Sequence, residues 1–134
     1  MRLAFQAKSC NEALARMAVA AFLTPLNPTL EELADTKTAV SEAVTNAIIH
    51  GYGEADGTVE VWCGRRGKEV FFSVKDTGAG IPDIGLAMEP MYTTKPEMER
   101  SGMGFSFMEA FTDELSVESA VGEGTVVKMK KVIG

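Results

Sequence analysis

The hydrophobic positions near the start of the chain change from a strand pattern to a helical one. Apolar and polar residues alternate over residues 2–7, which predicts a short first strand. Ser9 and Glu12 have the spacing of a capping box, and apolar residues then recur at helical intervals, which predicts a helix over roughly residues 10–22. Two prolines within residues 24–28 are expected to end this helix.

A second, longer helix is predicted after the prolines. Thr29 and Glu32 again have the spacing of a capping box, which places the helix start there. The apolar residues that follow share one face of a helix: Leu33, Val40, Val44 and Ile48. Gly51, directly after His50, is expected to end the helix.

The remaining patterns predict two hairpins. Residues 58–63 and 70–74 alternate like strands and are expected to turn around residues 65–67. Residues 115–119 and 125–132 resemble two final strands, with a glycine-rich turn between them. Together with the helices, these strands indicate a sheet covered on one face, an α/β architecture.

The segment between the hairpins differs from both. Residues 81–101 combine three prolines with charged and small residues, and the segment is too long for a passive connection in a small domain. We expect it to act as a lid. A short apolar helix is predicted after it, over residues 103–111.

Composition narrows the class of protein. A chain of 134 residues with 46% apolar residues fits a single domain, residues 1–134. The net charge is −6 and the 13 Lys and Arg residues are scattered, which argues against direct nucleic-acid binding. Cys10 and Cys63 lack metal-binding spacing and are expected to be reduced thiols. No apolar run approaches the ~20 residues that span a membrane, and no signal peptide is evident, so a cytoplasmic protein is expected.

Candidate chemistry begins on the second helix. Glu42 and Asn46 are four residues apart, so their side chains project from the same helix face about one turn apart. A carboxylate and an amide oxygen in this arrangement suit a general base beside a magnesium ligand. By itself the pair could equally be a solvated polar stripe.

Two glycine segments add to this pair. Asp76 precedes Gly78 and Gly80, an arrangement in which a carboxylate can recognise a base edge while the backbone approaches closely. Gly102 and Gly104 open the apolar helix, whose free N–H groups can bind phosphate. An ordinary turn and a plain helix start are the simpler alternatives for each segment alone, but the order of all three segments indicates a nucleotide site.

Two stretches, Val40 to Tyr52 and Thr93 to Phe105, resemble the GHKL ATP-binding superfamily and, within it, the sporulation anti-sigma serine kinases. The resemblance covers essentially the whole chain. It implies the Bergerat fold, a two-layer α/β sandwich with a mixed, mostly antiparallel sheet, helices on one face and an ATP lid.

The resemblance also implies specific roles. Asp76 should accept a hydrogen from the adenine amino group, where guanine carries a carbonyl oxygen, and Thr125 should assist through its hydroxyl. Asn46 should supply one Mg²⁺ ligand. Glu42 should accept the proton of an attacking hydroxyl, and Arg100 should neutralise the γ-phosphate in the transition state. A simple strand former is the alternative for Thr125, and a solvated lid charge is the alternative for Arg100.

The other residues implied to contact ATP or ADP lie at the helix end, in the glycine loop and along the lid: His50, Gly78, Gly80, Ile81, Thr94, Ser101, Gly102, Met103 and Gly104. His50 is the only histidine. We expect it to cap the helix or line the rim of the site, because a phosphohistidine normally accompanies a separate dimerising helix.

The implied partners are proteins. The resemblance indicates a homodimer that sequesters an RNA polymerase sigma factor and phosphorylates a serine of an anti-anti-sigma factor. Arg16 on the first helix is a candidate docking contact. Two other classes remain open, a nucleotide-dependent binding switch without phosphotransfer and an ATPase in which Glu42 activates water. The carboxylate of Glu42 argues against the switch, and the lid sequence with no transducer domain favours serine over water.

Overall fold

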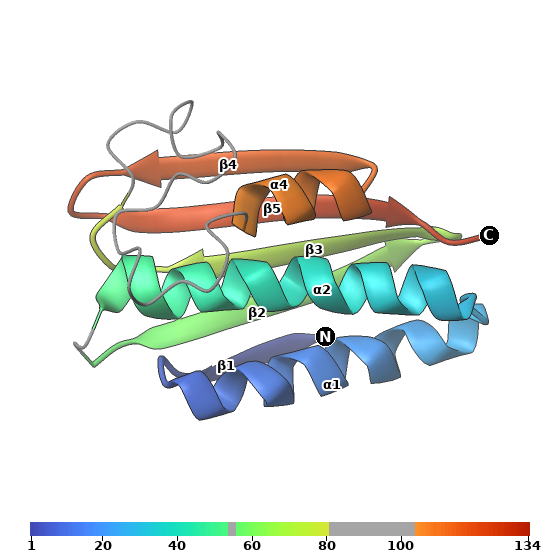
Figure 1. Cartoon of the computed structure of the whole chain (residues 1–134), viewed down its shortest axis with the longest axis horizontal. Coiled ribbons are helices and arrows are strands. Elements are labelled where there is room, and N and C mark those ends of the chain that lie inside the picture. The colour runs from blue at the N-terminus through green and yellow to red at the C-terminus, as the bar shows by residue number, and fades with distance from the viewer. Residues whose placement is uncertain (54–55, 81–103) are drawn as a thin grey trace.

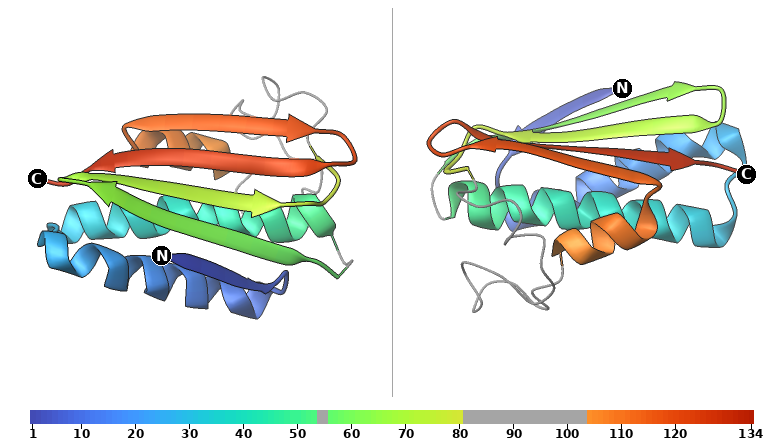
Figure 2. Two further views of the ribbon diagram at one scale, coloured as in Figure 1. Left: turned by 180° about the vertical axis from the view of Figure 1, so that it is seen from behind. Right: turned by 90° about the horizontal axis from the view of Figure 1, so that it is seen from above.

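The computed structural model describes residues 1–53, 56–80 and 104–134. Five strands form one sheet in the order β1-β2-β3-β5-β4, and every pairing in it is antiparallel. The strands are β1 (Arg2–Gln6), β2 (Thr58–Arg66), β3 (Glu69–Asp76), β4 (Glu114–Ala120) and β5 (Gly124–Val132). The described helices α1 (Glu12–Leu23), α2 (Leu30–Asn46) and α4 (Gly104–Phe111) all lie on one face of the sheet (Figures 1 and 2). The predicted two-layer α/β sandwich is confirmed, but the described strands are antiparallel throughout and the predicted mixed sheet is wrong in that respect.

Helix α2 begins at the predicted capping box. Thr29 Oγ1 accepts a hydrogen bond from the Glu32 backbone N–H at 3.0 Å, and the Glu32 carboxylate accepts one from the Thr29 N–H at 2.9 Å. Two N–H groups that a helix start leaves without partners are thereby satisfied. Glu32 also accepts a hydrogen bond from the Gly134 N–H at 2.7 Å, so the same side chain holds the end of the described chain.

The capping box predicted at Ser9 is wrong. Ser9 lies in a 3₁₀ turn, η1 (Ser9–Asn11), and its side chain caps neither this turn nor α1. The Glu12 carboxylate instead accepts a hydrogen bond from the Ser41 hydroxyl of α2 and lies 3.9 Å from Arg16 Nη1. The contact between the two helices therefore takes the carboxylate that the local spacing assigned to capping.

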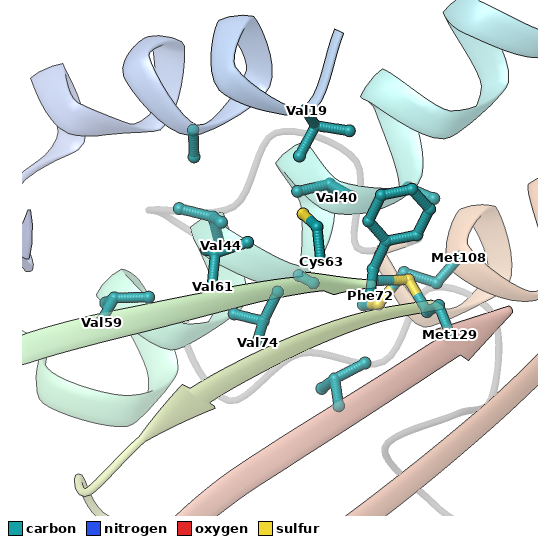
Figure 3. Close-up of a cluster of buried hydrophobic side chains, with 14 of the residues drawn as sticks. Val19, Val40, Val44, Val59, Val61, Cys63, Phe72, Val74, Met108 and Met129 are labelled. Atoms are coloured by element: carbon teal, nitrogen blue, oxygen red, sulfur yellow. The ribbon is translucent and has the colours of Figure 1, made fainter. Parts of the chain in front are cut away.

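The core lies between the sheet and the helices, as the apolar patterns predicted (Figure 3). Phe72, Val40 and Val44 are each at most 1% exposed. The other core side chains labelled in Figure 3 are Val19, Val59, Val61, Cys63, Val74, Met108 and Met129. Burying one large aliphatic or aromatic side chain contributes roughly 1.5–3 kcal/mol, so this layer fixes the position of α2 on the sheet.

Both predicted hairpins are present, with longer strands than expected. Arg65 and Arg66 belong to β2, and the turn itself falls at Gly67, whose φ of 61° suits glycine. β4 and β5 turn through residues 121–123. The predicted lid, residues 81–101, lies outside the described residues. No helix in the described part of the chain is long and apolar enough to cross a membrane.

The end of α2 differs from the prediction. The helix does not stop at Gly51 but continues as a π-helical turn, η3 (Ala47–Tyr52), and the chain turns away at Gly53, where φ is 63°. The Gly51 carbonyl oxygen accepts a hydrogen bond from the Ala79 N–H at 2.7 Å. The Gly51 carbonyl therefore contacts the segment after β3, and Gly51 does not end the helix.

Candidate functional site

Three segments that are distant in the sequence meet at one end of the sheet (Figure 1). They are η3, the segment that follows β3, and the turn between β4 and β5. Ala79 joins them, because its N–H donates to the Gly51 carbonyl at 2.7 Å and its own carbonyl accepts from the Gly122 N–H at 2.8 Å. The segment after Asp76 is thus held from both sides.

Asp76, the last residue of β3, places a buried carboxylate at this junction. The residue is 5% exposed. Its Oδ1 accepts the Gly78 N–H at 2.9 Å, and the Thr125 backbone N–H also donates to the carboxylate. Burial raises the pKa of Asp76, while these two hydrogen bonds act in the opposite direction. Asp76 makes no ion pair with any described residue, so the carboxylate can still accept hydrogen bonds from a ligand.

The glycines around Asp76 are required by close packing. A Cβ on Gly51 would lie 2.8 Å from Asp76 Oδ1, and one on Gly78 would lie 2.8 Å from Gly51 Cα and closer still to the Gly51 carbonyl. Gly80 has a φ of 78°, and a Cβ there would meet the Ala120 carbonyl. The predicted roles of Gly78 and Gly80 in close backbone approach are consistent with this geometry, although the approach that the structure shows is to protein backbone.

Thr125 lies beside Asp76, as expected for a residue that assists it. The two residues are register partners in the β3–β5 pairing, and Thr125 is 9% exposed. Its hydroxyl oxygen lies 2.8 Å from Ser119 Oγ, and Ser119 also donates to the Gly124 carbonyl at 3.0 Å. Sequence reasoning did not identify Ser119.

Tyr52, the last residue of η3, bonds two other segments through its hydroxyl. The hydroxyl donates to the Thr58 carbonyl at 2.7 Å and accepts the Thr77 N–H at 2.8 Å. Thr77 Oγ1 lies 3.1 Å from the same oxygen. Tyr52 therefore ties the residue after Asp76 to the beginning of β2.

Glu42 and Asn46 lie on the last two turns of α2, and His50 lies on η3. All three are half-buried. Asn46 Nδ2 is buried and has no hydrogen-bond partner among the described residues. Because the amide N and O exchange places on rotation, the Asn46 amide offers an unsatisfied polar atom that fits a metal or ligand contact.

A metal held mainly by protein side chains has no candidate in the described ranges, which contain no cluster of three or more His, Cys, Asp or Glu residues. Mg²⁺ does not need one, because it commonly keeps water and phosphate oxygens and takes one or two protein ligands. Gly104 is the first residue of α4, which agrees with the predicted glycine at a helix start. The other predicted lid residues lie outside the described residues: Ile81, Thr94, Arg100, Ser101, Gly102 and Met103.

The site residues that the sequence missed left different signals. Gly51 was expected only to end the helix that carries Glu42 and Asn46. Its contact with Asp76 of β3 depends on a π-helical turn, which no local sequence pattern indicated. Ser119 could have been found by counting outward from the predicted turn, since that places it opposite Thr125. Tyr52 is the last residue of the stretch from Val40 to Tyr52 that resembles the superfamily, but the resemblance assigned it no role.

Comparisons with known proteins agree with this arrangement. A family model described as a histidine kinase-like ATPase domain matches residues 5–131. An anti-sigma F factor from Clostridium kluyveri is 55% identical over 132 residues, covering 98% of this chain and 93% of that protein. An anti-sigma F factor from Thermoanaerobacter sp. strain X514 is 54% identical over all of this chain and 94% of its own.

Solved structures share the fold at low sequence identity. The crystal structure of the RsbU and RsbW domains of a Mycobacterium tuberculosis protein has a TM-score of 0.71 and 20% identity, covering 99% of this chain and 31% of that one. The catalytic domain of the histidine kinase ThkA has a TM-score of 0.60 and 22% identity, covering 75% of this chain and 68% of that one. The chain belongs to the histidine kinase-like ATPase domain family and, within it, to the anti-sigma F factors.

Proposed function

We propose that this chain binds ATP with Mg²⁺, transfers the γ-phosphate to a serine of an anti-anti-sigma factor, and as a homodimer sequesters an RNA polymerase sigma factor. One domain, residues 1–134, carries both activities. The relatives that match nearly the whole chain are named anti-sigma F factors, which supports a sigma factor as one partner. The family itself is a kinase-like ATPase domain, which supports nucleotide as the cofactor.

The observation that carries the nucleotide role is the buried Asp76 carboxylate. Its partners among the described residues are two backbone N–H groups, from Gly78 and Thr125. The carboxylate oxygens can therefore accept further hydrogen bonds from a ligand. An adenine amino group is a neutral donor of suitable shape for such a carboxylate. A guanine carbonyl oxygen would instead face it acceptor to acceptor.

The helix end supports the phosphate chemistry. With its amide turned so that the oxygen takes the place of Nδ2, Asn46 would hold the Mg²⁺ through that oxygen, and the buried position without a partner would be occupied. Mg²⁺ supplies charge neutralisation for the phosphates as the γ-phosphoryl group transfers. Glu42, one turn earlier, would accept the proton of the serine hydroxyl, and Arg100 would face the γ-phosphate from the lid.

The main test is phosphate transfer from Mg-ATP to a purified anti-anti-sigma protein, read by mass spectrometry. Wild type should produce phosphoserine on the partner. Glu42→Gln should lower the transfer rate by about 10²- to 10⁴-fold, the usual contribution of a general base, while ADP binding is retained. Glu31→Gln is a matched control, because Glu31 is an exposed carboxylate in the first turn of the same helix.

The outcomes separate the three classes of function. ATP binding without transfer would make the protein a nucleotide-dependent binding switch. Release of free phosphate without a modified partner would make it an ATPase in which Glu42 activates water. Transfer that survives in Glu42→Gln at the wild-type rate would remove Glu42 from the proposed mechanism.

The proposed docking surface is the exposed side of α1. Leu14 is 51% exposed and Met17 is 65% exposed, and the side chain of Arg16 on the same helix is 43% exposed. Arg16→Ala should weaken binding of the sigma factor or the anti-anti-sigma factor, measured by titration calorimetry in the presence of ADP. Arg65→Ala, an exposed arginine at the end of β2, is the control. Unchanged affinity for both partners in Arg16→Ala would refute the assignment.

A further inference from the structure

Strands β2 and β3 separate at the end of the sheet where the candidate site lies. Their paired register ends at Glu60 and Lys75, and the same register two residues further on would bring Thr58 opposite Thr77. Both of these residues belong to the described part of the chain, and no direct backbone hydrogen bond joins them there. The Tyr52 hydroxyl of η3 lies between them instead, 2.7 Å from the Thr58 carbonyl oxygen and 2.8 Å from the Thr77 backbone nitrogen. A side chain from the helix end therefore takes the place of a hydrogen bond between strands.

The hydrogen bonds at this hydroxyl have fixed directions. A carbonyl oxygen only accepts, so the single hydroxyl hydrogen of Tyr52 points to Thr58. The Tyr52 oxygen accepts the Thr77 N–H, and Thr77 Oγ1, at 3.1 Å, is a second donor to the same oxygen. The tyrosine ring packs against Gly57, where a Cβ would lie only 2.3 Å from Tyr52 Cε1. Packing of the ring and the partners of its oxygen therefore both set the position of the hydroxyl.

Three successive N–H groups after Asp76 each have one acceptor. The first, from Thr77, donates to Tyr52 at 2.8 Å, and the third donates to the Gly51 carbonyl at 2.7 Å. The second, from Gly78, donates to Asp76 Oδ1 at 2.9 Å and so orients the carboxylate. The outer two bonds both end on η3. The direction in which the Asp76 carboxylate points therefore depends on two contacts with η3, one of which is the Tyr52 hydroxyl.

We propose that Tyr52 is a positioning residue for base recognition, whose hydroxyl holds the residue after Asp76 so that the carboxylate faces the amino group of the base. The proposal rests on the proposed function, in which Asp76 accepts a hydrogen bond from the adenine amino group. Tyr52 acts through Thr77 rather than by touching the nucleotide. Without the hydroxyl only the Gly51 contact remains, and the carboxylate loses part of its alignment with the base.

The test is titration calorimetry with Mg²⁺ on the full chain, using ADP and purine riboside 5′-diphosphate. The second nucleotide carries a hydrogen in place of the amino group at position 6, so it offers Asp76 no donor there. Wild type should bind ADP more tightly. Tyr52→Phe removes only the hydroxyl and should lower the ratio of the purine riboside and adenine dissociation constants by about three- to tenfold, the effect of one hydrogen bond. The change should come from weaker ADP binding, with the affinity for purine riboside diphosphate close to that of wild type.

Two further variants separate positioning from a general loss of stability. Thr24→Val removes a hydroxyl that donates to the Ala20 carbonyl at 3.0 Å, at the far end of α2 from η3, and should leave the ratio unchanged (Figure 1). Thr77→Val keeps the backbone N–H but removes the hydroxyl contact with Tyr52, and should lower the ratio by a smaller factor than Tyr52→Phe does. If Tyr52→Phe does not fold, Thr77→Val carries the same comparison.

Three results would overturn the inference and leave the proposed function intact. They are equal weakening of both nucleotides in Tyr52→Phe, an unchanged ratio in Tyr52→Phe, and an equal fall of the ratio in Thr24→Val. A wild type that binds both nucleotides equally would remove Asp76 from recognition of the amino group, and this inference with it. A wild type that binds neither nucleotide would overturn the proposed function itself.

Discussion

Gly78→Ala should damage the candidate site through backbone packing alone. Gly78 is not among the described glycines with positive φ, so alanine meets no conformational strain there. The obstacle is Gly51 of η3. A Cβ on Gly78 would lie 2.8 Å from Gly51 Cα, whereas an ordinary contact is 3.4–4 Å, and it would lie still closer to the Gly51 carbonyl.

The cost can be estimated from what must move. The Gly51 carbonyl accepts the Ala79 N–H at 2.7 Å, and a shift that relieves the clash stretches or breaks this bond. Losing one such bond costs about 0.5–1.5 kcal/mol, and overpacking adds roughly 1–3 kcal/mol. We expect a loss of about 2–4 kcal/mol in the free energy of unfolding. For a domain of this size the melting temperature should then fall by roughly 6–20 °C.

The assay is thermal unfolding followed by circular dichroism, together with ADP titration. Gly64→Ala is the matched control, because Gly64 lies in β2 and a Cβ there would meet nothing within 4 Å. Gly64→Ala should melt close to wild type and bind ADP normally. A Gly78→Ala variant that behaves like Gly64→Ala in both measurements would refute the argument that glycine is needed for the approach of η3.

Three further predictions concern single groups. Tyr52→Phe removes the hydroxyl that is hydrogen-bonded to the Thr58 carbonyl and the Thr77 N–H. The variant should lose about 1 kcal/mol in the free energy of unfolding in urea and should bind ADP more weakly. An unchanged ADP affinity would show that these two hydrogen bonds do not position the site. Cys63 is buried and its thiol pKa is raised to about 11, so a thiol reagent at pH 8 should modify the exposed Cys10 and reach Cys63 only on unfolding; rapid labelling of both thiols in the native protein would contradict this. The raised pKa of Asp76 means that the folded state holds this proton more tightly than the unfolded state does. Its contribution to stability should therefore fall as pH rises from near 3.8 through the raised pKa, and Asp76→Asn should lack that part of the pH profile in urea unfolding; identical profiles for wild type and Asp76→Asn would contradict it.

Most of the fold could be predicted because its signals are local. Alternation identified the strands, and the box at Thr29 and Glu32 gave the start of α2. The box at Ser9 failed for a tertiary reason, since Glu12 is used between helices and Ser9 entered a 3₁₀ turn. Strand order is also a property of long-range contacts, and the sequence pattern indicated a sheet without showing how β5 comes to lie between β3 and β4.

The candidate site divides in the same way. Asp76, Gly78 and Thr125 were predicted from short motifs and resemblance, and the structure brings them together. Tyr52 bonds Thr77, which is 25 residues away, so spacing within one motif does not reveal that contact. Ser119 lies only six residues from Thr125, and the predicted turn between their strands would have placed the two opposite each other. The roles predicted for the lid, including that of Arg100, remain predictions.

The π-helical turn η3 sets the rotational position of its own last residues, Gly51 and Tyr52, around the helix axis. A π turn accommodates about one more residue than an α turn, which makes η3 equivalent to a one-residue insertion. Deleting Ile49 would restore a regular α-helix and rotate the later residues by about 100° around the helix axis. Gly51 would then no longer face Asp76, and a bulkier neighbour would be turned toward the carboxylate. A deletion that makes the helix more regular would therefore misalign the site. The π-helical irregularity keeps Gly51 of η3 in line with Asp76 at the end of β3.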